Sequence, residues 1–206
     1  MGDKSTRNFN LFLIISLVVT FIWSAINPLY PFTWFLEVLP AIIGVIILLA
    51  IHKRFKFSQL SYFLLWAHAI ILIVGGHYTY AENPLFNWLK ELLSLNRNYY
   101  DRVGHFAQGF VPAIIAREVL IQKKVVENKK WLFFIIVFVI LGFSAFYELI
   151  EWWVAIWQGE AATAFLASQG DIWDAQADML MCFIGSIVSL LLLSKYHDRS
   201  MKKLKK

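Results

Sequence analysis

The sequence predicts an all-α protein, a polytopic membrane helix bundle of six transmembrane helices that forms a single integral-membrane domain over residues 1–206. Its 206 residues are 59% hydrophobic and only 16% charged, with a mean hydropathy of +0.60. Soluble domains are only roughly half apolar. Long apolar windows recur along the chain, and basic residues cluster between alternate windows. The net charge of +5 therefore reflects membrane topology, and we exclude a soluble nucleic-acid-binding protein.

Five spans follow from apolar windows, because a bilayer core about 30 Å thick needs roughly 20 apolar residues per helix. The first window is uncharged, and Trp23 lies where a signal peptide would need small residues, so we expect a retained helix. The second contains Glu37 and the third His68, whereas the last two carry acidic residues near one end only. These spans are predicted at residues 9–26, 34–51, 60–76, 131–157 and 173–193.

The fourth span, residues 103–121, is polar and rests on the distribution of basic residues. If all six segments cross, every basic cluster falls on one side of the membrane, whereas omitting the fourth places the last two clusters on opposite sides. Because basic loops favour the cytoplasm, the sequence predicts a bacterial inner-membrane protein with six crossings and both termini cytoplasmic. The clusters are Lys4/Arg7, Lys53/Arg54/Lys56, Arg117/Lys123/Lys124/Lys129/Lys130 and Lys195/Arg199/Lys202/Lys203/Lys205/Lys206.

The loop between the third and fourth spans contains the segment PLFNWLKELLSL, residues 84–95. Its apolar residues recur at helical spacing, with Lys90 and Glu91 between them. This pattern predicts a short interfacial helix that lies on the outer membrane surface.

Acidic residues recur at helical spacings in three predicted outer helix ends. Residues three, four or seven positions apart share one side of a helix. We therefore expect carboxylates and an imidazole to point toward a common space. The residues are Asp101, His105 and Gln108 in the fourth helix, Glu148 and Glu151 in the fifth, and Asp171, Asp174 and Asp178 in the sixth.

Charges inside membrane segments are costly and usually serve a function or pair with one another. Arg97 and Arg102 are the only nearby arginines, too few to neutralise these acids. The carboxylates then bind a cation, for which a divalent metal is the first alternative, or form an acid–base site or proton relay without metal. In the first case the metal ligands are His105, Glu148 and Asp178, with Asp101, Glu151 or Asp174 as catalytic base or additional ligand.

Structural roles compete with these assignments. Asp171 and Asp174 are placed to interact with a helix N-terminus, and Asp101 is placed to pair with a neighbouring arginine. His77 joins the site or has a structural role, and we expect His68 to be a hydrogen-bonded packing residue.

Four strings resemble, in the same order, the YjdF-type family of bacterial inner-membrane proteins: GGHYTYAE, YDRVGHFAQGFVPA, SAFYELIEWW and QGDIWDAQADM. The resemblance covers roughly residues 34–199 and implies multi-pass inner-membrane placement without supplying a reaction. The order of Asp101, His105, Phe106, Glu148, Asp178 and Gly185 is more distantly similar to VanZ-like proteins, which are associated with glycopeptide resistance. The spacing differs, and the YELIEWW and QGDIWD elements are additional here.

Three functions remain open from the sequence. The first is an envelope enzyme, a metal-assisted hydrolase or transferase that acts on a lipid or lipid-linked substrate in the bilayer. The second is a small ion- or proton-coupled transporter, although such a pathway needs polar groups along its whole length. The third is a structural or accessory membrane protein in which the acidic cluster stabilises the bundle. The oligomeric state is also open.

Overall fold

The computed structural model describes residues 2–158 and 163–205, and within these ranges the chain is helical and contains no strand. The predicted all-α class is confirmed. The helices are α1 (Gly2–Ser24), α2 (Pro31–Ile51), α3 (Gln59–Tyr78), the 3-10 helix η1 (Tyr80–Glu82), α4 (Pro84–Leu92), α5 (Tyr100–Gln122), α6 (Lys129–Gln158), α7 (Thr163–Leu166), α8 (Asp174–Lys202) and the 3-10 helix η3 (Lys203–Lys205).

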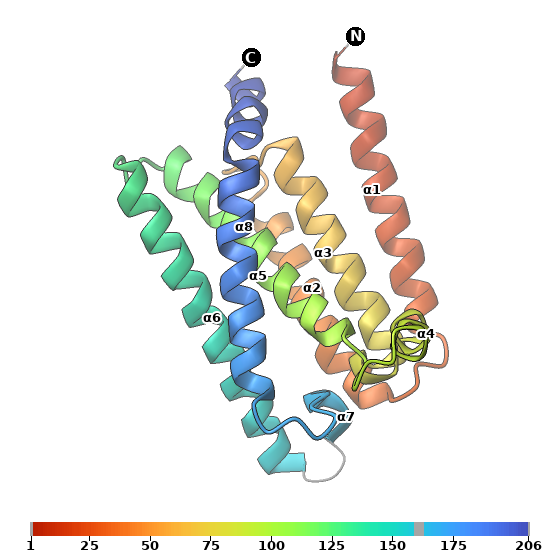
Figure 1. The fold of residues 1–206 in the computed structure, drawn as a ribbon. Coiled ribbons are helices and arrows are strands. Elements are labelled where there is room, and N and C mark those ends of the chain that lie inside the picture. The colour runs from red at the N-terminus through yellow and green to blue at the C-terminus, as the bar shows by residue number, and fades with distance from the viewer. Residues whose placement is uncertain (1, 159–162, 206) are drawn as a thin grey trace.

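The long helices lie side by side and reverse direction at each connection (Figure 1). Both chain termini lie at one end of the bundle, which we call the terminal end. The opposite end, which we call the loop end, holds α4, α7 and the first turns of α5 and α8 (Figure 1). Helices α1, α2, α3, α6 and α8 are long and apolar enough to cross a membrane.

Each predicted span corresponds to an observed helix, with differences at the ends. The helix predicted at 173–193 continues to Lys202, so the basic C-terminal segment extends α8 beyond its apolar part. The segment predicted to form an interfacial helix is helical as α4, which begins at Pro84 after an Asn83 side chain that accepts a hydrogen bond from the Phe86 N–H. This arrangement is typical of helix starts, since proline lacks the N–H that the first turn leaves unpaired.

Helix α5 is long enough to span a bilayer, but it is less apolar than the other five long helices because it carries charged residues at both ends. Asp101, Arg102, Arg117 and Glu118 are each less than one-tenth exposed. The helix packs against α3, α6 and most extensively against α8, so protein rather than lipid surrounds these charges. Charged side chains in membrane proteins are tolerated in such interior positions.

Helices α5 and α8 pack in direct backbone contact at two glycines. A Cβ atom at Gly109 would lie 1.8 Å from the Cys182 carbonyl oxygen, and one at Gly185 would lie 2.2 Å from the Phe106 carbonyl oxygen. Small residues at helix interfaces permit such close approach in membranes, where van der Waals packing drives association. The two glycines therefore set the distance between the helices that carry most of the polar side chains at the loop end.

The middle of the bundle is an apolar core between the two ends. Its buried members include Val111 and Ile114 of α5, Ile136 of α6, and Cys182 and Leu190 of α8. The core separates a polar cluster at the loop end from a second one at the terminal end.

Candidate polar site at the loop end

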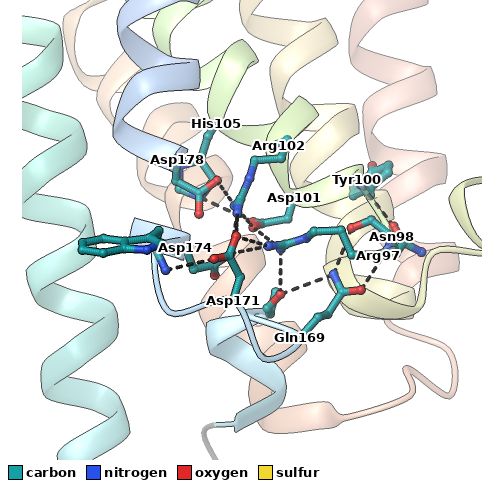
Figure 2. A network of polar contacts seen from close by, with 12 residues as sticks. Arg97, Asn98, Tyr100, Asp101, Arg102, His105, Gln169, Asp171, Asp174 and Asp178 are labelled. Carbon is teal, nitrogen blue, oxygen red and sulfur yellow. Dashed lines mark hydrogen bonds and ion pairs between the residues drawn. The ribbon is translucent and has the colours of Figure 1, made fainter. Parts of the chain in front are cut away.

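Two arginines join the start of α5 to the start of α8 (Figure 2). Arg97 Nη1 and Arg102 Nη2 each donate to Asp174 Oδ1 at 2.6 Å, and Arg102 Nη1 donates to Asp178 Oδ1 at 2.5 Å. Arg102 Nη1 also donates to Asp101 Oδ2 at 3.1 Å. Asp101 therefore forms the local ion pair that we considered as its structural role, and Asp174 Oδ1 accepts from both guanidinium groups.

Asp171 completes this arginine–aspartate cluster from the loop before α8. Its Oδ2 lies 3.3 Å from Arg97 Nη1 and from Arg102 Nη2, and its Oδ1 accepts from the Trp173 N–H at 2.9 Å. The two arginines thus contact four aspartates, although the sequence suggested carboxylates without partners. The structural reason is that one forked guanidinium can bind several oxygens at once.

Hydrogen bonds join Arg97 and its neighbour Asn98 to the loop before α8, and Arg97 Nη2 donates to the Ala167 carbonyl at 3.1 Å. Gln169 Oε1 accepts from the Asn98 N–H at 2.8 Å, and Gln169 Nε2 donates to the Asn98 carbonyl at 2.9 Å. The Asn98 side chain accepts from the Tyr100 N–H at 3.0 Å and so satisfies one donor at the start of α5. The loop before α8 is thereby attached to the loop before α5 (Figure 2).

His105 lies between carboxylates of three helices. Its Nε2 lies 3.4 Å from Asp101 Oδ1 and 3.9 Å from Asp178 Oδ1, while its Nδ1 lies 2.9 Å from Gln108 Oε1 and 3.7 Å from Glu148 Oε1. The structure thus brings together the predicted ligands His105, Glu148 and Asp178. Glu148 faces the other ring nitrogen, however, and the buried group whose ligand atoms lie within 4.8 Å of one another is Asp101, His105 and Asp178.

A cavity of about 90 Å³ adjoins this group. Space of this size holds several water molecules or a small organic group. Three buried polar atoms in and beside it have no hydrogen-bond partner in the described part of the chain: Glu37 Oε2, His68 Nε2 and Glu148 Oε1. The lining residues are Glu37, Pro40, His68, Leu72, Tyr80, Asp101, Gly104, His105, Gln108, Tyr147, Glu151 and Phe165.

Several of these cavity residues were missed or read differently from the sequence. Glu37 is the only charged residue of its predicted span, and that isolation is the signal that could have singled it out. His68 was expected to be hydrogen-bonded, whereas its Nε2 has no partner among the residues that the structure describes. His77 does not line the cavity; its Nδ1 lies 3.0 Å from the Ser24 carbonyl oxygen and its ring packs against Trp23. Burial raises the pKa of the Tyr80 hydroxyl well above its usual range, so this group stays neutral.

A second polar network lies at the terminal end, and sequence reasoning did not predict it. Glu118 accepts hydrogen bonds from Ser58 N–H at 2.6 Å, from Ser58 Oγ at 2.9 Å and from Gln122 Nε2 at 2.8 Å, and it also contacts Ser61 Oγ.

His197 is the remaining partner of Glu118 in this network. Its Nε2 lies 2.9 Å from Glu118 Oε2, and its Nδ1 lies 3.1 Å from Arg117 Nη1. Arginine can only donate, so Nδ1 is the acceptor and the His197 proton is on Nε2, directed at Glu118.

We expect Glu118→Gln to lower the free energy of unfolding by about 2 kcal/mol, because it removes charge-assisted hydrogen bonds to a fully buried carboxylate. The check is chemical unfolding of the detergent-purified protein, followed by circular dichroism. Glu127→Gln is the control, since Glu127 is exposed. Equal stability of the two variants would contradict a stabilising role for this network.

Comparisons with known proteins agree with the multi-pass arrangement. A family model described as "Predicted membrane protein (DUF2238)" matches residues 9–199. The chain belongs to the DUF2238 family. It is also 43% identical over 189 residues to inner membrane protein YjdF of Escherichia coli (strain K12), which covers 92% of this chain and 90% of that protein. No solved structure matches significantly.

The resemblance to the YjdF-type family seen in the sequence is therefore confirmed. Together with the apolar helices, this DUF2238 membership makes the chain a multi-pass protein of the inner membrane that resides in a lipid bilayer. Most of its polar cluster at the loop end is buried within that bundle, and Asp171 lies at the exposed edge of the cluster.

Proposed function

We propose that the chain forms one integral-membrane domain that crosses the inner membrane six times, with the terminal end in the cytoplasm. The alternating helix directions place the basic connections after α2 and α5 and the basic end of α8 at the terminal end (Figure 1), and basic loops favour the cytoplasm. Helix α5 is the additional span, because its charges are buried against neighbouring helices. Exposed Leu85, Trp88 and Leu92 suit α4 to the outer interface.

The loop end then faces the outer side of the membrane, and we propose that it holds a divalent cation on Asp101, His105 and Asp178. The observation that carries this proposal is the buried group in which His105 Nε2 faces two carboxylate oxygens at 3.4 and 3.9 Å. These separations exceed a normal hydrogen bond. They suit atoms that share an ion at about 2.1 Å, and an imidazole with two carboxylates is a usual ligand set.

Arg102 does not prevent ion binding at this group. It donates to Asp178 Oδ1 and Asp101 Oδ2, but a carboxylate oxygen has more than one acceptor site. Its guanidinium orients both carboxylates toward the ion position, and its charge lowers the affinity for the ion. Gln108, on the other side of the imidazole, orients the ring because its Oε1 accepts a hydrogen bond from Nδ1 at 2.9 Å, as outer partners of metal-bound histidines do. Glu148 Oε1 lies further from the same nitrogen, at 3.7 Å.

A metal at this position supports hydrolysis or group transfer on a membrane-resident lipid or lipid-linked substrate. A bound ion polarises a phosphoryl or carbonyl oxygen and lowers the pKa of bound water. Glu151 lines the adjoining cavity and is the carboxylate placed to accept a proton there. Asp174, held by two arginines, serves the site by positioning Arg102 rather than as a base.

The packing counts against an ion- or proton-coupled transporter. Between Gln108 and Arg117, α5 presents only apolar residues and glycine over about 12 Å. Val111 and Ile114 are buried there in the apolar core. A charge that moved between the two polar clusters would have to cross this core.

Elemental analysis of the purified protein tests the cation site. After chelator washing and exposure to Mg²⁺, Mn²⁺, Fe²⁺ and Zn²⁺ separately, we expect about one equivalent of one ion in the wild type. We expect less than about a tenth of an equivalent in His105→Ala and Asp178→Asn, because each loses a ligand atom.

Glu91→Gln is the matched control, because Glu91 is an exposed carboxylate at the same end of the bundle. It should bind the ion as the wild type does. Absence of metal from a folded wild type, or full occupancy in both ligand variants, would contradict the proposed site.

A further inference from the structure

The cavity beside the proposed cation site has a property that the cation does not explain. Glu37 is only 3% exposed and lines the cavity. Within residues 2–158 and 163–205 its Oε2 has no hydrogen-bond partner, although Thr79 Oγ1 donates to its Oε1 at 3.4 Å. A buried carboxylate oxygen without a partner is costly. Among the described residues no donor reaches this oxygen, so it is free to accept a hydrogen bond from a group bound in the cavity.

The excess of carboxyl groups at the loop end also favours a bound group with positive charge. Seven carboxyl groups surround two guanidinium groups and the His105 imidazole, and both arginines contact only the four aspartates among the seven. Neither arginine contacts the three glutamates. The seven are Glu37, Asp101, Glu148, Glu151, Asp171, Asp174 and Asp178.

The lining favours an organic cation over a second metal ion. Glu37 and Glu151 do not belong to a group of three close ligand atoms within the part of the chain that the structure describes. The residues that line the cavity include three aromatic ones, Tyr80, Tyr147 and Phe165. Aromatic faces attract ammonium groups, whereas a hard metal ion needs four or more oxygen or nitrogen ligands.

We propose that this cavity binds the ammonium group of a primary amine. An ammonium group has three donors, and the cavity offers Glu37 Oε2, the Glu151 carboxylate and His68 Nε2 as acceptors. Resting on the proposed function, this site identifies the substrate class as an amine-bearing molecule, whose ammonium group occupies the cavity while the adjoining cation site acts on it. The amine belongs either to a lipid headgroup or to a small free molecule.

Binding is measured on the full-length, chelator-treated protein, so that the result does not depend on the metal. Ethanolamine hydrochloride is titrated while thermal unfolding is recorded. In the control titration, ethanol replaces the amine and sodium chloride matches the ionic strength. We expect a saturable rise in Tm with ethanolamine alone. Glu37→Gln should weaken apparent binding by at least about tenfold, since an amide cannot supply the ionic acceptor. Glu91→Gln, at an exposed carboxylate outside the cavity lining, should bind the amine within about threefold of the wild type, and Glu151→Gln repeats the test if Glu37→Gln does not fold.

Nanodiscs distinguish the source of the amine. If the headgroup is the ligand, the wild type in phosphatidylethanolamine discs has a higher Tm than in phosphatidylglycerol discs, and added ethanolamine has no further effect. If a free amine is the ligand, ethanolamine raises Tm equally in both. A wild type that responds no more to ethanolamine than to the control, or variants of the cavity glutamates that bind as the wild type does, would overturn the proposal. Loss of metal binding alone would overturn only the proposed cation site.

Discussion

Arg102→Leu is expected to lower the free energy of unfolding by about 4 kcal/mol, because it leaves buried aspartates without their shared partner. Arg102 donates through Nη1 to Asp101 and Asp178 and through Nη2 to Asp174. Its side chain is only 9% exposed, so water replaces little of what is lost. Thermal and chemical unfolding of the purified variant measure this loss.

Arg102→Lys is the conservative variant that isolates the forked geometry. Lysine presents one ammonium group and cannot bridge aspartates on opposite sides of its head group as a guanidinium does. We expect it to recover less than half of the lost stability. Arg54→Leu, at an exposed position outside any ion pair in the described residues, controls for removal of a charge. If Arg102→Lys were as stable as the wild type, the guanidinium would not be the group that organises the loop end.

Comparing variants of Arg102 and Asp178 distinguishes a loss of stability from a loss of ion binding. Asp178→Asn keeps an oxygen for Arg102 but weakens the proposed ligand set, so its stability should fall by less than that of Arg102→Leu. The two variants therefore distinguish an aspartate that mainly holds the fold from one that holds an ion.

The fold could be predicted from the sequence where lipid and water impose a simple pattern. Apolar windows located α1, α2, α3, α6 and α8, because these helices expose apolar side chains on the bundle surface. Helix α5 fails the same test, since a hydropathy window sums its charges without knowing that protein covers them. The distribution of basic residues recovered this helix because topology acts on loops rather than on the span itself.

The candidate site was predictable only within single helices. Helical spacing placed Asp101 and His105 on one side of α5, and their side-chain atoms lie 3.4 Å apart. Contacts between helices were not accessible in this way. Arg97 donates to the Ala167 carbonyl, 70 residues further along the chain, and the role of Glu37 depends on a cavity shared with α3, α5 and α6.

Gly109→Ala is expected to disrupt the bundle, with a loss of about 3 kcal/mol or more in the free energy of unfolding. The new Cβ would lie 1.8 Å from the Cys182 carbonyl oxygen and 2.6 Å from its carbonyl carbon. Those are backbone atoms of α8 and cannot rotate aside, so the two helices must separate. Separation would move Asp178 away from His105 and Arg102, and we therefore expect reduced metal binding together with reduced stability.

Gly142→Ala in α6 provides the matched control for this clash. A Cβ at Gly142 meets no atom of the described residues within 4 Å, and alanine favours helix by about 1 kcal/mol over glycine. We expect Gly142→Ala to be neutral or slightly stabilising and to bind metal as the wild type does. Because both substitutions add the same methyl group to a helix, the difference in their unfolding free energies isolates the α5–α8 contact. A Gly109→Ala protein as stable as Gly142→Ala would mean that these helices do not pack as closely as the structure places them.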